Sequence, residues 1–187
     1  MALNADNVRV GLNGNVYVAP KGSTAPADLT SAWDPAWVDL GYLNDDGVEM
    51  EYGTDVEDIM AWQSLSPVRR VLTSVELTLA FTAIELRASV VTLYFPDSTI
   101  TEVTADTVFK LDIPSAPGSA EMAFGFEWVD GDITNRVVIP RGEVTDRESV
   151  NFQRGEPVGL GMTVSAYASS SPELATWLSN DPSWAPA

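Results

Sequence analysis

Alternation of polar and apolar residues is the feature that most constrains the fold of this chain. In the stretch DDGVEMEYGTDVEDIMAW, Val48, Met50 and Tyr52 alternate with Glu49 and Glu51. Successive side chains of a β-strand point to opposite faces, so this two-residue period predicts a half-buried strand. An ordered strand with a row of carboxylates on one face raises the question of what that face meets.

The same period recurs along most of the chain. In the run VLTSVELTLAF, Val75, Leu77, Leu79 and Phe81 share one face. Strands are predicted at residues 15–19, 48–52, 71–81, 108–113, 121–129, 134–139 and 158–168. The sequence therefore predicts a mainly β, antiparallel fold.

One helix is predicted directly after the strand 71–81. Thr82 and Glu85 have the spacing of a capping box, and Pro96 supplies a stop. Between them apolar residues recur on one face, at Ile84, Ala88, Val91 and Phe95. We expect this helix to pack against the sheet.

The rest of the chain is organised around a single predicted domain, because there is no internal repeat and no clear domain boundary. Its core is residues 38–168, within which 53–70 is the least regular long segment and is predicted to be a loop. Residues 1–37 form an N-terminal strand and an arm rich in Pro, Ala, Ser and Thr. Residues 169–187 are predicted to be a C-terminal tail.

The charge balance excludes some classes of partner. The chain has 27 acidic and 10 basic residues, a formal net charge of −17. Such a surface repels phosphate, so tight binding of nucleic acid or of an anionic membrane is not expected. The simplest role for the acidity is to keep the chain soluble.

Two residue types are missing altogether. Without cysteine and histidine the chain has no disulfides, no thiolate metal sites and no nucleophile system based on Cys or on Ser–His. The beginning of the sequence lacks the pattern of a signal peptide, and no apolar run approaches the ~20 residues that span a bilayer. We expect a soluble protein made in the cytoplasm.

The many carboxylates raise the possibility of a catalytic acid pair or of a calcium site. A glycosidase needs two acids that flank a sugar, and candidate groups are Asp45/Asp46, Asp55, Glu57/Asp58 and Glu143/Asp146. With so many acids, close pairs arise by chance. The phrase NDDGVE lacks the ligand spacing of an EF-hand. No catalytic residue, metal ligand or cofactor is predicted.

Four tryptophans lie in the arms, which cannot form a core alone: Trp33, Trp37, Trp177 and Trp184. In a monomer these rings would be exposed. In an assembly they could anchor the arms in pockets of a neighbour, and this second interpretation is favoured.

Two long stretches carry a family resemblance. The first, residues 38–86, contains the phrase LGYLNDDGV, the pattern I-x-A-W-Q at Ile59 to Gln63, an Arg pair, and a long strand that runs into FTAIELRASVVTLYF. The second is VVIPRGEVTDRESVNFQRGEPVGLGMTVSAYA, residues 137–168. Together they resemble the major tail (tail tube) proteins of long, non-contractile-tailed bacteriophages.

The resemblance implies a fold and a role. The fold would be an antiparallel β-sandwich or barrel-like core with one flanking α-helix and extended arms. The protein would be a structural, non-enzymatic virion component without cofactors, six copies of which form a ring. Rings would stack into a tube whose lumen holds a tape-measure protein and later passes DNA. Further partners would be the tail tip and tail terminator proteins.

The resemblance also assigns roles to particular residues. Glutamates on the polar phase of the predicted strands are candidates to face the lumen: Glu49, Glu51, Glu76, Glu121 and Glu127. Each phosphate that a cation neutralises adds affinity through counterion release, so an acidic lumen would let DNA slide.

The segment 53–70 is expected to reach the adjacent ring. Its acidic residues, Asp55, Glu57 and Asp58, and its basic end, Arg69 and Arg70, are predicted to pair across subunits and to fix register. The apolar residues expected to be buried there are Ile59, Met60, Trp62 and Leu65.

Two alternatives stay open. One is another ring- or tube-forming virion or secretion protein, such as a tail terminator or completion protein, which would form closed single rings. The other is a carbohydrate-binding β-sandwich, which would bind glycan as a monomer.

Overall fold

The computed structural model describes residues 4–169 and 173–185. The strands are β1 (Asn13–Pro20), β2 (Val38–Asp39), β3 (Leu43–Ile59), β4 (Arg69–Ala83), β5 (Thr99–Thr104), β6 (Val108–Asp112), β7 (Met122–Asp130), β8 (Ile133–Arg147), β9 (Leu160–Ala166) and β10 (Thr176–Ser179). The helices are α1 (Ala88–Tyr94) and two 3₁₀ turns, η1 (Ala5–Asn7) and η2 (Pro182–Trp184). The predicted mainly β, antiparallel fold with one α-helix is confirmed within these ranges.

One strand joins the two halves of the main sheet. The strand order is β2-β1-β7-β8-β9-β4-β3, and β10 adds to β8. Gly142 in β8 pairs with Met122 on β7 and with Ala166 on β9. The first part of β8 therefore belongs to one half of the sheet and its last residues to the other, which gives a sandwich-like fold.

The core lies between these two halves. From β4 it receives Leu77, Leu79 and Phe81, which are buried as the alternation predicts. The helix α1 adds Val90 and Leu93 to this core. Substitution of a core leucine by alanine would leave a cavity, which typically lowers the free energy of unfolding by about 2–5 kcal/mol.

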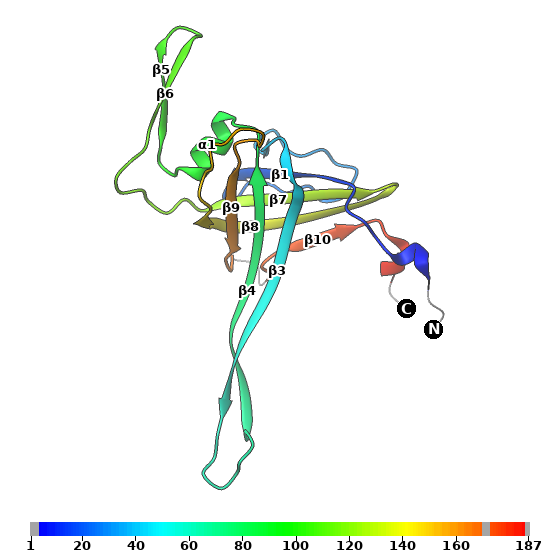
Figure 1. The fold of residues 1–187 in the computed structure, drawn as a ribbon. Coiled ribbons are helices and arrows are strands. Elements are labelled where there is room, and N and C mark those ends of the chain that lie inside the picture. The colour runs from blue at the N-terminus through cyan, green and yellow to red at the C-terminus, as the bar shows by residue number, and fades with distance from the viewer. Residues whose placement is uncertain (1–3, 170–172, 186–187) are drawn as a thin grey trace.

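Two hairpins project from the body in opposite directions (Figure 1). The outer part of β3–β4 extends far beyond the sheet, and β5–β6 leaves the molecule near α1. The two terminal 3₁₀ turns, η1 and η2, lie together at one side of the molecule. Among the described residues, no helix is long and apolar enough to cross a membrane.

The predicted start of the helix is wrong. Thr82 and Ala83 still belong to β4, where they pair with Gly161 and Leu160 of β9. The helix begins only at Ala88, and its N-cap residue makes no side-chain capping bond. The sheet ladder prevails over the local capping signal because it satisfies the backbone of these residues directly.

The segment 53–70 is also different from its prediction. Residues 53–59 continue β3, and Arg69 and Arg70 begin β4. Only residues 60–68 form a loop, so the feature is a long hairpin. The polar sequence of residues 53–59 lacks the usual apolar signal of a strand, because neither face of the outer β3–β4 hairpin meets the core.

Three strands, β2, β5 and β10, lie where none was predicted. The strand β5 carries β-branched residues at Thr99, Ile100, Thr101, Val103 and Thr104, which favour a strand locally. The predicted C-terminal tail contains β10, which pairs with β8.

Candidate functional site

The β3–β4 hairpin has two chemically different faces. Residues that pair across an antiparallel ladder point to the same side, so the register assigns each side chain to a face. The pairs Glu49↔Ala80 and Glu51↔Thr78 lie on one side, and Met50↔Leu79 and Tyr52↔Leu77 on the other.

The first side is an acidic face that spans four strands. It comprises Glu49, Glu51 and Asp55 on β3, Glu76 on β4 and Glu143 on β8, and hereafter "acidic face" means these five residues. Between them lie hydroxyl side chains at Ser74, Thr78, Thr163 and Ser165. The registered pairs that build this face contain no lysine or arginine. Over these pairs the acidic face consists of carboxylates and hydroxyls without cations, and Arg69 lies on the same side only at the outer end of the hairpin, opposite Ile59.

Hydrogen bonds between side chains order parts of the acidic face. Ser74 Oγ donates to Asp55 Oδ2 (2.8 Å), and the hydroxyls of Thr145 and Ser165 are 2.8 Å apart. The carboxylates of Glu49, Glu51 and Glu76 are exposed. Since they take part in no ion pair among the described residues, their charge is directed to solvent.

The opposite side of the hairpin is an apolar stripe. Near the body it enters the core through Leu77, but further out it is exposed at Tyr52 (66%), Val56 (51%), Leu72 (55%) and Val75 (40%). A β-bulge between Asp55 and Val56 shifts the register, and Val56 pairs with Leu72 beyond it. A row of exposed apolar side chains of this length is typical of an interaction surface.

Within the part of the chain that the structure describes, the hydrogen bonds of the hairpin tip, residues 60–68, are local. Val68 N–H donates to the carbonyl of Ile59 (2.9 Å), which closes the loop. Trp62 and Leu65 are fully exposed, and Met60 is more than half exposed. Large apolar side chains at a projecting tip are poorly solvated, which favours contact with another protein.

The ion pairs predicted across subunits are partly made within the hairpin. Arg70 Nε and Nη2 donate to the two carboxylate oxygens of Asp58 at 2.7 and 3.0 Å. This bond lowers the pKa of Asp58 and raises that of Arg70. Arg69, in contrast, has no ion pair among the described residues. Asp55 is engaged by Ser74, and Glu57 is exposed.

The five glutamates predicted to face a lumen do not share one surface. Glu49, Glu51 and Glu76 lie on the acidic face, as described. Glu121 instead binds Arg141 and, at 2.5 Å, Lys21, and these hydrogen bonds lower its pKa to about 2.

Glu127 lies beneath the N-terminal arm. It accepts from Arg136 Nε (2.7 Å) and pairs with Nη2 at 2.5 Å, while Arg136 also donates to the carbonyls of Asp28 and Ser31. The guanidinium of Arg136 is buried and lies 4.8 Å from the centre of the Trp33 ring. Glu127 therefore holds the arm rather than contributing to the acidic face.

The tryptophans of the N-terminal arm pack on their own chain. Trp33 stacks on Tyr17 with ring centroids 4.4 Å apart and contacts Trp37 at 4.8 Å. Trp37 is buried, and its Nε1 donates to the carbonyl of Thr24 (2.9 Å). Gly125 makes room for Trp33, because a Cβ there would lie 2.3 Å from its ring. In the single chain these two rings therefore pack into a pocket formed by their own subunit.

The tryptophans near the C-terminus remain partly exposed. Trp177 and Trp184 form an edge-to-face pair with centroids 5.3 Å apart, and Trp177 Nε1 donates to Asn135 (3.0 Å). They stay 40% and 52% exposed, so they keep an apolar surface that a neighbour can cover.

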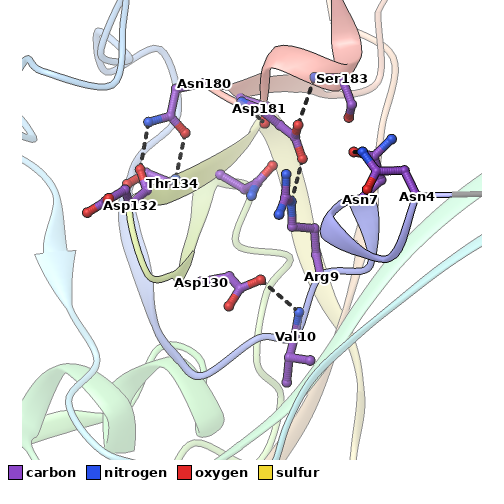
Figure 2. A network of polar contacts seen from close by, with 12 residues as sticks. Asn4, Asn7, Arg9, Val10, Asp130, Asp132, Thr134, Asn180, Asp181 and Ser183 are labelled. Carbon is purple, nitrogen blue, oxygen red and sulfur yellow. Dashed lines mark hydrogen bonds and ion pairs between the residues drawn. The ribbon is translucent and has the colours of Figure 1, made fainter.

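A polar junction ties the two terminal segments together (Figure 2). Arg9 Nε lies 2.5 Å from Asp181 Oδ2, and Asp181 Oδ1 accepts from the backbone N–H of Ser183 (2.8 Å). The bond from Arg9, followed by that from Ser183, lowers the pKa of Asp181. Asp181 is buried, so this carboxylate is fixed in place.

Three further hydrogen bonds attach this junction to the β7–β8 turn and the start of β8. Val10 N–H donates to Asp130 Oδ2 (3.2 Å). Asn180 accepts from Thr134 N–H (2.7 Å) and donates to the carbonyl of Asp132 (2.9 Å). No local sequence pattern predicts this junction, because Arg9 and Asp181 are 172 residues apart in the chain.

The geometry gives little support to metal binding by the carboxylates. Asn44 Nδ2 donates to Asp46 Oδ2 (2.6 Å) within the NDDG segment, which lies in β3 where the register with β4 shifts between Leu43 and Val48. In the ranges that the structure describes, no group of three His, Cys, Asp or Glu residues is placed to hold a metal ion.

The comparison with known families decides the identity. A family model described as "Phage tail tube protein" matches residues 1–187, the whole chain. The chain belongs to the phage tail tube protein family. It is therefore a structural component of the virion tail, and the tail tube protein self-assembles into a tube with other tail proteins as partners. No curated protein matches the chain.

Proposed function

We propose that this tail tube protein forms hexameric rings that stack into a tube, and that its acidic face lines the lumen through which DNA leaves. The observation that carries this proposal is the acidic face itself, a row of carboxylates and hydroxyls on strands whose other side enters the core near the body and is an exposed apolar stripe further out. The number of six subunits rests on the family resemblance.

Ring closure is supported by the open edges of the sheet. The strand β3 pairs only with β4, and residues 143–147 of β8 pair only with β9, among the described residues. Strand edges carry unpaired N–H and C=O groups that readily pair with another chain. Neighbouring subunits joined edge to edge would form one closed barrel, in which no edge stays open.

The passage of DNA follows from the charge of that barrel. A duplex carries one phosphate per ~1.7 Å of its length, and each contact with a cation adds salt-dependent affinity. A lumen of carboxylates and hydroxyls offers no such contact. We therefore infer a channel that repels DNA slightly and does not retain it.

Ring stacking is assigned to the β3–β4 hairpin. Its tip carries Trp62 and Leu65 fully exposed at the end of the longest projection (Figure 1). Burial of such side chains contributes roughly 1.5–3 kcal/mol each, before the cost of ordering the loop. The contact with the adjacent ring is thus expected to be apolar, with Glu57 and Arg69 at its rim.

The role is structural, and we propose no enzymatic activity. The expected partners are further copies of the chain, the tape-measure protein inside the tube, and the tail tip and tail terminator proteins at its ends. DNA would be a transient passenger.

Negative-stain electron microscopy of the purified protein over a range of concentrations tests this function. Open-ended hollow tubes of stacked rings are the expected result. Closed single rings that never stack would instead indicate a terminator or completion protein. A persistent monomer that binds glycan would contradict the proposal.

A further inference from the structure

The β5–β6 hairpin is a second projection, directed away from the tip of β3–β4 (Figure 1). Its strands pair with each other and with no third strand of the described chain. Every residue of β5 is exposed, and β6 is exposed except at Leu111. A two-stranded hairpin alone is marginally stable in water, so this one is suited to gain a partner.

The register gives this hairpin one apolar and one polar face. Ile100 pairs with Leu111 and Glu102 pairs with Phe109, so these four side chains share one side. Ile113 follows in phase just after β6, and Phe109 and Ile113 are 63% and 57% exposed.

The other side of the hairpin is mainly polar, with one exposed apolar side chain at Val108, which pairs with Thr104 beyond a register shift. Thr99 pairs with Asp112 and Thr101 with Lys110, and Lys110 Nζ lies 2.7 Å from Asp112 Oδ1. The charges of this side are thus satisfied within the hairpin. The apolar side is the one that lacks cover.

We propose that the apolar face of β5–β6 (Ile100, Phe109, Leu111 and Ile113) receives the β3–β4 tip of a second copy of this chain in the next ring. The proposal rests on the ring stacking proposed above and names the surface that the tip meets. Two different surfaces at opposite ends of one molecule make a head-to-tail contact, which repeats into an open filament. A tube, the form that this family builds, is such a filament.

The chemistry of the two surfaces is complementary. The tip offers Trp62 and Leu65, both fully exposed, to a face of similar apolar character. Arg69, beside the tip, has no ion pair among the described residues, and Glu102 is the one carboxylate on the receiving face. An Arg69–Glu102 contact would fix the orientation of the tip more than it would add affinity.

Engineered cysteines test the contact directly, because the chain has none of its own. The full-length variant Leu65→Cys/Phe109→Cys is polymerised and treated with a mild oxidant. A disulfide needs Cβ atoms about 3.5–4.5 Å apart, so it forms only where the two surfaces meet. We expect a ladder of covalent multimers on a non-reducing denaturing gel. The matched control is Leu65→Cys/Thr101→Cys, whose second thiol lies on the polar side and should crosslink several-fold less.

A charge substitution gives a second readout. Phe109→Glu and Thr101→Glu add the same charge to opposite faces of one exposed hairpin, so neither disturbs the core. An unpaired charge in the contact should lower the polymer mass recovered by sedimentation about tenfold or more for Phe109→Glu, and little for Thr101→Glu.

The outcomes separate this proposal from the one it rests on. Wild-type tubes together with equal crosslinking of both cysteine pairs, or with unchanged polymerisation of Phe109→Glu, overturn the β5–β6 assignment and leave the tube function standing. A wild-type chain that forms no tubes, even on isolated tail tips, overturns both.

Discussion

Arg70 clamps Asp58 across the outer end of the β3–β4 hairpin through two parallel bonds of 2.7 and 3.0 Å. The two residues are registered opposite each other, one pair before the strands end. Because both side chains reach solvent, the bond matters less for overall stability than for the order of the tip it precedes.

Removal of the Arg70–Asp58 bond is therefore predicted to change the order of the hairpin tip and not the stability of the whole domain. Arg70→Gln should leave the melting temperature nearly unchanged but increase amide hydrogen exchange in residues 60–68. Exchange measured by mass spectrometry on the monomer checks this. Equal exchange in variant and wild type would show that the loop is ordered without the clamp.

Trp62 is predicted to be essential for elongation and dispensable for folding. Its side chain is fully exposed, so Trp62→Ala should keep the circular dichroism spectrum and melting temperature of the wild type. Tubes should be absent or much shorter in electron micrographs, and Trp62→Phe should restore them in part. Normal tubes from Trp62→Ala would remove the tip from the stacking contact.

Charge reversal on the acidic face is predicted to slow DNA ejection. Glu51→Lys places a cation beside the expected path of DNA, and a sixfold ring multiplies it. Tubes should still form, since the side chain points away from the core. Glu156→Lys makes the same charge change on an exposed loop outside this face and is the matched control. Ejection kinetics followed by DNA-dye fluorescence should change for the first variant alone.

The Glu121 cluster is predicted to contribute stability that acid removes. Hydrogen bonds from Arg141 and then Lys21 lower the pKa of Glu121 from 4.5 to about 2. A depressed carboxyl pKa stabilises the fold above the unfolded-state value, and this contribution is lost as pH falls through the folded-state value. Glu121→Gln should thus be less stable than wild type at pH 7, and the gap should close between pH 4.5 and about 2. A gap that is constant with pH would mean that the pairing of charges does not cause it.

Gly125 is predicted to be required for the packing of the N-terminal arm against the sheet. A Cβ at this position would meet the Trp33 ring at 2.3 Å, so Gly125→Ala should displace the ring from Tyr17. We expect a loss of about 1–3 kcal/mol in the free energy of unfolding and a change in tryptophan fluorescence. Gly53→Ala, whose Cβ would meet nothing within 4 Å, is the control.

How much of this molecule the sequence could predict depends on the range of the interactions. The alternation through Leu77, Leu79 and Phe81 predicted both the strand and its buried face. It succeeds because strand periodicity is local and one face meets the core. The capping box at Thr82 failed because a distant strand, β9, competes for the same backbone.

The candidate site shows the same difference between features set by local sequence and features set by distant residues. Glu49 and Glu51 were placed on the polar side by their alternation alone, and the structure keeps them together. Glu121 and Glu127 have the same alternation, but Arg141 and Arg136 arrive from β8 and engage them. No local pattern reports such partners, nor the folding of the arm over Gly125.

The lumen placement of the acidic face can be seen in a reconstruction of the assembled tube by cryo-electron microscopy, at a resolution that places side chains. We expect Glu49, Glu51 and Glu76 to point into a continuous lumen with no lysine or arginine beside them. A tube in which these glutamates face outward, or in which cations line the channel, would contradict this placement.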